Sequence, residues 1–253
     1  MNPPSLVSVA PLPNRRVAVW QIVRFVVVAF VCLGATATTF AQSQSKNLAP
    51  GFSFIPKNAT VLIMPPDVEL FSISGGGVYE PKADWTSAAH QHLHAAVSRT
   101  AGELGLHAKE CQESDADEYA EISALHAAVA RSIAFHHLGI GGFSLPTKAG
   151  LLDWSLGDAV KVIREKSSAD YALFIWIRDS YASSERKAAM VALALLGVGV
   201  VGGMQIGYAS LVDLNDGRIV WFNRLARSSG DLREEGTAAE TVKTLFEKFP
   251  GTK

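Results

Sequence analysis

Cysteine is nearly absent from this chain of 253 residues, which has only Cys32 and Cys111. Cys32 lies in a segment that we expect to be removed, so the folded protein keeps Cys111 alone. A single cysteine cannot form an intramolecular disulfide, and a disulfide framework is therefore excluded. About 210 residues remain after removal of that segment, which is enough for one domain with an ordinary core.

A basic excess is absent as well. Beyond residue 41 the chain has 20 basic and 24 acidic residues, a net charge of −4 with histidine neutral. Proteins that bind nucleic acids carry basic patches or stripes that neutralise phosphates. No such stripe is present, and we expect no nucleic-acid partner.

Sequence motifs for catalysis are also lacking. The glycines Gly75–Gly77 have neither the Gly-x-Gly-x-x-Gly spacing nor the Gly-Lys-Ser/Thr ending of phosphate loops, and Ser144 is not in a Gly-x-Ser-x-Gly turn. We predict no catalytic residue and no cofactor, and interpret the chain as a non-enzymatic protein. A small-ligand-binding module with its pocket near the Gly75 loop is one alternative.

The second alternative is a periplasmic metal-assisted hydrolase. His90 and His94 are four residues apart in a predicted helix, a spacing that places both on one face. No glutamate completes a His-Glu-x-x-His pattern, and no third ligand can be named. We therefore predict no metal site, with these two histidines as the only candidates. His126 is expected to be a core residue.

The first 41 residues resemble an export signal. Three arginines and no acidic residue precede an apolar stretch, residues 25–35, and Thr39-Phe40-Ala41 offers a small-x-small cleavage site. The alternative is a short membrane anchor that is not cleaved. We expect an exported protein of the periplasm or cell envelope, with residues 42–58 as a linker and 59–253 as a single αβ domain.

The periodicity of the domain predicts alternating strands and helices, hence a mixed β-sheet with helices packed on it. The C-terminal part should be a β-hairpin followed by a helix. The predicted elements are strands over 59–64, 67–74, 106–111 and 170–178, helices over 84–104, 113–138, 153–165 and 237–249, and a hairpin over 205–222. The strand over 170–178 is apolar on both faces and should be central.

The residue types between the two strands of the hairpin predict the geometry of its turn. Asn215-Asp216-Gly217 separates two apolar stretches, and glycine adopts a positive φ without a Cβ clash. We expect a type I turn followed by Gly217 in the left-handed region, or a two-residue type I′ turn. Trp221 and Trp176 should both be buried in one sheet core.

The most apolar stretch after the leader is Ala188–Met204, which has no charged residue. Gly199, Gly203 and Gly207 recur every four residues, a spacing that lets helices approach closely. We expect a helix that presents these glycines to the protein's own sheet. The alternative is contact with a membrane or with a second subunit, although the stretch is short for a bilayer span.

Two segments carry a resemblance to a known family. Ala169–Phe174 reads ADYALF, and Leu211–Trp221 has the form Leu-Val-Asp-Leu-x-x-Gly-x-Ile-Val-Trp, which includes Asp213, Gly217 and Trp221 as structural positions. The chain resembles envelope proteins related to the curli secretion-channel lipoprotein and to the amino-terminal domain of the Tol-Pal translocation protein. It differs in the residues before Cys32, which form a poor lipobox, and in carrying the apolar stretch.

The resemblance implies a periplasmic αβ domain that works by assembly rather than by chemistry. Envelope proteins, among them further copies of the chain, are the partners it suggests. Membrane contact through Ala188–Met204 is the other mode of action that we consider.

We predict that export removes residues 1–41. Sequencing the N-terminus of the protein purified from the envelope fraction should give Gln42 as the first residue, because signal peptidase cleaves after small residues. A mature protein that begins at Met1 would contradict this and support the anchor.

Overall fold

The computed structural model describes residues 45–139 and 143–253, and the predicted export signal lies outside them. Within these residues seven strands form one mixed sheet, the sheet type that the sequence predicted, although the short strand β3 was not expected. They are β1 (Thr60–Ile63), β2 (Asp67–Ile73), β3 (Tyr79–Pro81), β4 (His107–Glu110), β5 (Tyr171–Ala182), β6 (Gln205–Asp213) and β7 (Ile219–Arg227).

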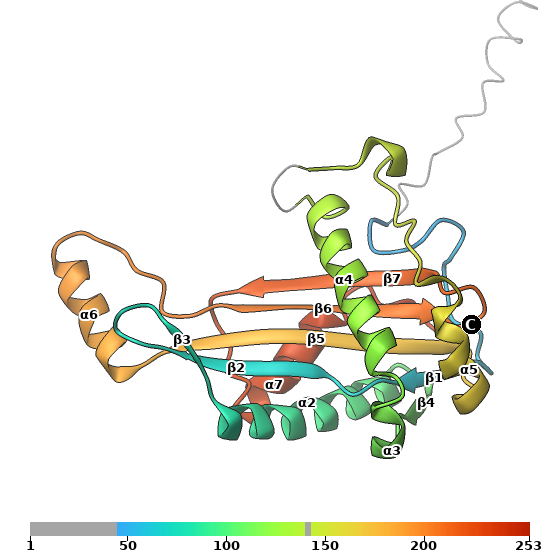
Figure 1. Cartoon of the computed structure of the whole chain (residues 1–253), viewed down its shortest axis with the longest axis horizontal. Coiled ribbons are helices and arrows are strands. Elements are labelled where there is room, and N and C mark those ends of the chain that lie inside the picture. Colours follow the sequence, from blue (N-terminus) through green and yellow to red (C-terminus); the bar gives the residue numbers. More distant parts are fainter. Residues whose placement is uncertain (1–44, 140–142) are drawn as a thin grey trace, which may run out of the picture. The chain divides into compact units, whose positions relative to one another are not determined.

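The long strand β5 is the centre of the sheet, as its apolar sequence indicated (Figure 1). Strands β1 and β2 lie one after the other along one side of β5, both parallel to it. On the other side β6 pairs antiparallel with β5, and β7 pairs antiparallel with β6. Because β5 has 12 residues and β1 only 4, the last residues of β5 reach far beyond the β1–β4 end of the sheet.

Helices cover both faces of this sheet. Helices α2 and α7 pack on one face, and α4 and α5 pack on the other. The described helices are α2 (Ala83–Glu103), α3 (Glu113–Ala116), α4 (Ala120–His136), α5 (Lys161–Ser167), α6 (Ser184–Leu195) and α7 (Glu235–Leu245), with short 3-10 turns η1 (Pro146–Lys148) and η2 (Gly157–Val160).

Several boundaries differ from the predicted ones. The single helix expected over 113–138 is divided into α3 and α4, and the helix expected from residue 153 begins with η2. Residues 45–58, in the segment expected to be a linker, pack against the domain: Ala49 and Ile55 are buried, and Ile55 donates a backbone hydrogen bond to Gly251.

The two tryptophans lie on opposite faces of the sheet. Trp221 is fully buried against α7, in contact with Phe246 and Phe249. Trp176 is only partly buried, on the α4 face, where its ring stacks on Tyr208. The expectation of burial in one shared core was therefore correct for Trp221 and wrong for Trp176. Successive side chains of a strand point to opposite faces of the sheet, and these two tryptophans occupy positions that face opposite ways.

The hairpin turn agrees with its sequence. Asp213 accepts hydrogen bonds from the Asn215 backbone through its side chain and from Gly217 through its carbonyl. Gly217 has φ +74°, and a Cβ on it would lie 2.3 Å from the carbonyl oxygen of Gly157. Two requirements therefore select glycine here, the positive φ and the close approach of a second loop.

Gly217→Ala should destabilise the domain more than Gly150→Ala. Gly150 has a similar φ of +72° but no atom within 4 Å of its Cβ position. The control should lose about 1–2 kcal/mol from backbone strain, and Gly217→Ala about 1–3 kcal/mol more from overpacking. Urea unfolding of both variants measures this, and equal losses would show that the Gly157 loop moves aside freely.

Candidate functional site

An apolar arm leaves the sheet at the end of β5. We define the arm as α6 together with the return segment, residues 196–204, which leads into β6 (Figure 1). None of the residues of α6 is buried, and Leu195 and Leu196 are 85% and 77% exposed. The other exposed large apolar side chains of the arm are Val191, Val198, Val201 and Met204.

The predicted burial of Ala188–Met204 is therefore wrong. The glycines expected on one helical face are not on one helix either: α6 ends at Leu195, Gly199 and Gly203 lie in the return segment, and Gly207 lies in β6. The Cβ position of Gly203 is only 2.0 Å from the Ser180 carbonyl oxygen. This glycine therefore permits contact with β5 of the same sheet, whereas Gly199 has no neighbour within 4 Å.

Local hydrogen bonds explain where the arm begins and ends. The Ser183 hydroxyl caps α6 by accepting from the Arg186 backbone at 3.2 Å. The Arg186 guanidinium donates to the Val201 carbonyl at 3.0 Å, which joins the helix to the return segment. At the other end, Met204 N donates to the Ser180 hydroxyl at 3.0 Å.

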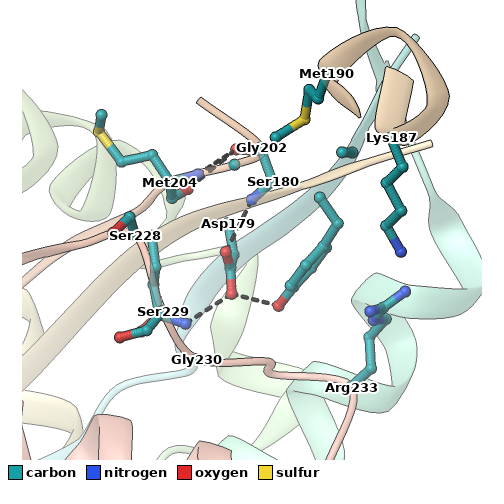
Figure 2. Close-up of a pocket in the computed structure, with 14 residues that line it drawn as sticks. Asp179, Ser180, Lys187, Met190, Gly202, Met204, Ser228, Ser229, Gly230 and Arg233 are labelled. Carbon is teal, nitrogen blue, oxygen red and sulfur yellow. Dashed lines mark hydrogen bonds between the residues drawn. The ribbon is translucent and has the colours of Figure 1, made fainter. Parts of the chain in front are cut away.

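A polar pocket of about 240 Å³ lies at the base of the arm (Figure 2). Its buried acid is Asp179, whose carboxylate accepts from Tyr181 Oη at 2.5 Å, Gln205 Nε2 at 2.6 Å and the Ser180 backbone at 2.8 Å. Arg227 Nε in turn donates to Gln205 Oε1 at 2.8 Å. This Asp179 network joins the ends of β5, β6 and β7.

Burial raises the pKa of Asp179, and the hydrogen bonds from Tyr181 and Gln205 offset part of that increase. Burial also raises the pKa of Tyr181, which is raised further by its hydrogen bond to Asp179. The Tyr181 hydroxyl therefore stays protonated and donates to the carboxylate while it accepts from Leu232 N at 2.8 Å.

Two cationic side chains line the open part of the pocket. Lys187 is exposed, and Arg233 pairs with Asp231 at 2.5 Å and lies over the Tyr181 ring at 4.1 Å (Figure 2). The Ser180 hydroxyl is bonded to the Met204 backbone in both directions. In the described part of the chain this hydroxyl bonds to that backbone and to no side-chain base, so its hydrogen bonds join the end of β5 to the return segment.

The candidate metal ligands lie elsewhere. His90 and His94 line a cleft between α2 and β4 together with Glu110 and Cys111. His94 Nε2 is 3.0 Å from Glu110 Oε2, and burial lowers the pKa of His90. Within residues 45–139 and 143–253, no three His, Cys, Asp or Glu side chains are arranged to hold a metal ion.

The glycine loop is the turn of a hairpin. Gly75–Gly77 joins β2 to β3 and packs against the start of α6, where the Gly75 Cβ position is 3.5 Å from Glu185 Cβ. The loop therefore borders the base of the arm and does not lead into a helix N-terminus as a phosphate loop does.

No helix in the described part of the chain is both long and apolar enough to cross a membrane.

Exchanging Asp179 for asparagine should change how stability depends on pH. A carboxyl whose pKa is raised on folding stabilises the protein fully below its unfolded pKa of about 3.9 and loses that contribution as pH rises through the folded value. Relative to the parent, the free energy of unfolding of Asp179→Asn should therefore increase from pH 4 to pH 7. A constant difference in urea unfolding over this range would contradict the shift.

No protein-family model matches the sequence, and no curated protein matches it. Among solved structures, the PelC dodecamer from Paraburkholderia phytofirmans is 10% identical over 79% of this chain and 92% of that chain, with a TM-score of 0.39. Lipoprotein GNA1162 from Neisseria meningitidis is 13% identical over 75% and 96%, with a TM-score of 0.30. The C-terminal domain of LpoB from Salmonella enterica is 13% identical over 72% and 88%, with a TM-score of 0.28. These values assign no family, so the function is inferred from the chain's own residues.

Proposed function

We propose that this chain is a non-enzymatic protein of the cell envelope that associates with a membrane surface through its arm. The observation that carries the proposal is that no residue of α6 is buried, in a stretch with no charge between Lys187 and Asp213. From Ala188 onward the helix carries only apolar side chains, and a helical segment of this kind is stable where its surroundings are apolar.

The dimensions favour insertion into one side of a bilayer. A helix of twelve residues is about 18 Å long, well below the roughly 30 Å of the hydrocarbon core. Interfacial helices lie within about 5–10 Å of the boundary between head groups and acyl chains. At this depth head groups and water can still reach the backbone of the return segment.

The charges at the root of the arm fit this position. Glu185, Arg186 and Lys187 are the last charged residues before the apolar stretch and sum to +1. Basic residues beside a membrane-inserted segment are attracted to anionic lipids. The export signal expected over residues 1–41 would bring the chain to such a surface.

Assembly with other envelope proteins or further copies is the second candidate, and one observation favours it. Among the described residues, the backbone of 199–203 forms one hydrogen bond, from Arg186 to Val201 O. Unpaired backbone groups are costly in hydrocarbon, whereas a protein partner could supply donors and acceptors.

The double variant Leu195→Ser/Leu196→Ser should lose association with liposomes. Burial of each leucine contributes about 1.5–3 kcal/mol, so binding should weaken roughly a hundredfold or more. Both side chains are exposed, and the free energy of unfolding should change by less than about 1 kcal/mol. Flotation with protein purified from the envelope fraction measures the association.

Leu151→Ser/Val162→Ser is the matched control, since these apolar residues are also exposed but lie far from the arm in the sequence. It should float like the parent. If the arm variant floats unchanged, membrane association through the arm is wrong. If the parent forms an oligomer without lipid and the arm variant is monomeric, assembly replaces membrane association as the function.

A further inference from the structure

A second apolar surface lies beside the arm, on the α4 face of the sheet. Helix α4 leaves the outer ends of β5, β6 and β7 uncovered there, and a groove of about 390 Å³ remains. Its floor is the stacked pair Trp176 and Tyr208, with ring centroids 4.8 Å apart. The lining residues that surround this pair include Arg131, Phe135, Met204, Ile206, Arg224 and Ala226.

The groove is built on rigid elements. The Tyr208 hydroxyl donates to the Ala127 carbonyl of α4 at 3.4 Å, and burial raises the pKa of Tyr208 to about 12. Beneath it, His126 is buried and its ring stacks on Phe174 at 4.2 Å. Phe135 and Ile206 are 49% and 38% exposed, so apolar surface remains uncovered in the monomer.

Three arginines surround this apolar floor, and two of them are not neutralised. Arg178 pairs with Asp67 at 2.7 Å and lies over the Trp176 ring. Arg131 and Arg224 are both exposed, and neither forms an ion pair with any side chain that the structure describes. Arg131 Nε donates to the Ala127 carbonyl at 3.3 Å, which leaves its terminal nitrogens for other acceptors. The groove therefore offers hydrocarbon contact along its floor and, at its edge, two cations without an acidic partner among the described residues.

We propose that this groove binds a single-chain anionic amphiphile, with the acyl chain on Trp176 and Tyr208 and the carboxylate or phosphate at Arg131 and Arg224. Guanidinium groups form strong bidentate hydrogen bonds with such oxyanions. The volume falls within the roughly 300–1,000 Å³ of small-molecule sites. The arm of a second copy fits less well, because its one acidic residue, Glu185, lies in the first turn of α6 and is followed directly by Arg186 and Lys187.

This site goes beyond membrane association and does not depend on it. Met204 and Ile206 line the groove where β6 begins, next to the return segment. An amphiphile that leaves a lipid surface in contact with the arm would find the groove immediately beside it. Binding can nevertheless be measured in solution without vesicles, and the arm variant should retain it.

Calorimetric titration of the full chain with fatty acids below their critical micelle concentrations tests the proposal. From octanoate to decanoate to dodecanoate, affinity should rise about fourfold per methylene, the equivalent of about 0.8 kcal/mol for each buried CH₂. Dodecanol, which has the chain without the charge, should bind at least about tenfold more weakly than dodecanoate.

Arg131→Gln/Arg224→Gln should reduce dodecanoate affinity to that of dodecanol and leave dodecanol binding unchanged. Arg164→Gln is the control, an exposed arginine of α5 outside the groove lining, and should bind like the parent. Ala226→Phe should weaken both ligands about tenfold or more, because Ala226 is exposed and a larger side chain fills the groove without disturbing the core.

Equal binding of dodecanoate by the double arginine variant and the parent would overturn the proposal. The absence of dodecanoate binding would also overturn it. If, in addition, Ala226→Phe changed the oligomeric state of the protein, the groove would be an interface between copies of the chain. Loss of liposome association in Leu195→Ser/Leu196→Ser with intact dodecanoate binding would support the groove and the arm as separate surfaces.

Discussion

The buried carboxylate of Asp179 is the interaction on which the end of the sheet depends. Burying a charge is costly unless donors surround it, and here the Ser180 backbone, Tyr181 and Gln205 supply three hydrogen bonds. Gln205 is the partner of Asp179 in the β5–β6 register. The network therefore fixes the ends of the strands from which the arm departs. The arm has no core of its own, but its first and last residues are held in place in this way.

The same end of the sheet explains why apolar surface stays exposed. Strand β5 continues to Ala182, and beyond Trp176 the α4 face is not covered by a helix. Side chains on that face, such as Ile206 and Ala226, would be core residues if a second helix lay beside α4 (Figure 1). The groove and the arm thus have one structural cause: β5, β6 and β7 extend beyond the helix that covers their α4 face.

Sequence patterns predicted the features that are determined locally. The central strand β5, the hairpin and the positive φ of Gly217 follow from period-two apolar patterns and turn chemistry, and all three are present. Exposure of the arm could not be predicted in this way, because an apolar stretch has the same sequence whether it is buried or projects. The Asp179 network joins residues as far apart as Tyr181 and Leu232, and a lone acid in a strand gives no signal of its distant partners.

The chemistry of the two apolar surfaces separates their occupants. The arm has no charge between Lys187 and Asp213, so nothing along it can select a charged group, and it distinguishes only apolar surroundings from water. The groove combines an aromatic floor with Arg131 and Arg224, so it distinguishes an anionic head from a neutral one. The arm recognises hydrocarbon alone, and the neighbouring groove recognises hydrocarbon with one negative end. Together they are suited to the boundary of an anionic lipid layer, where hydrocarbon and negative head groups lie at the same depth.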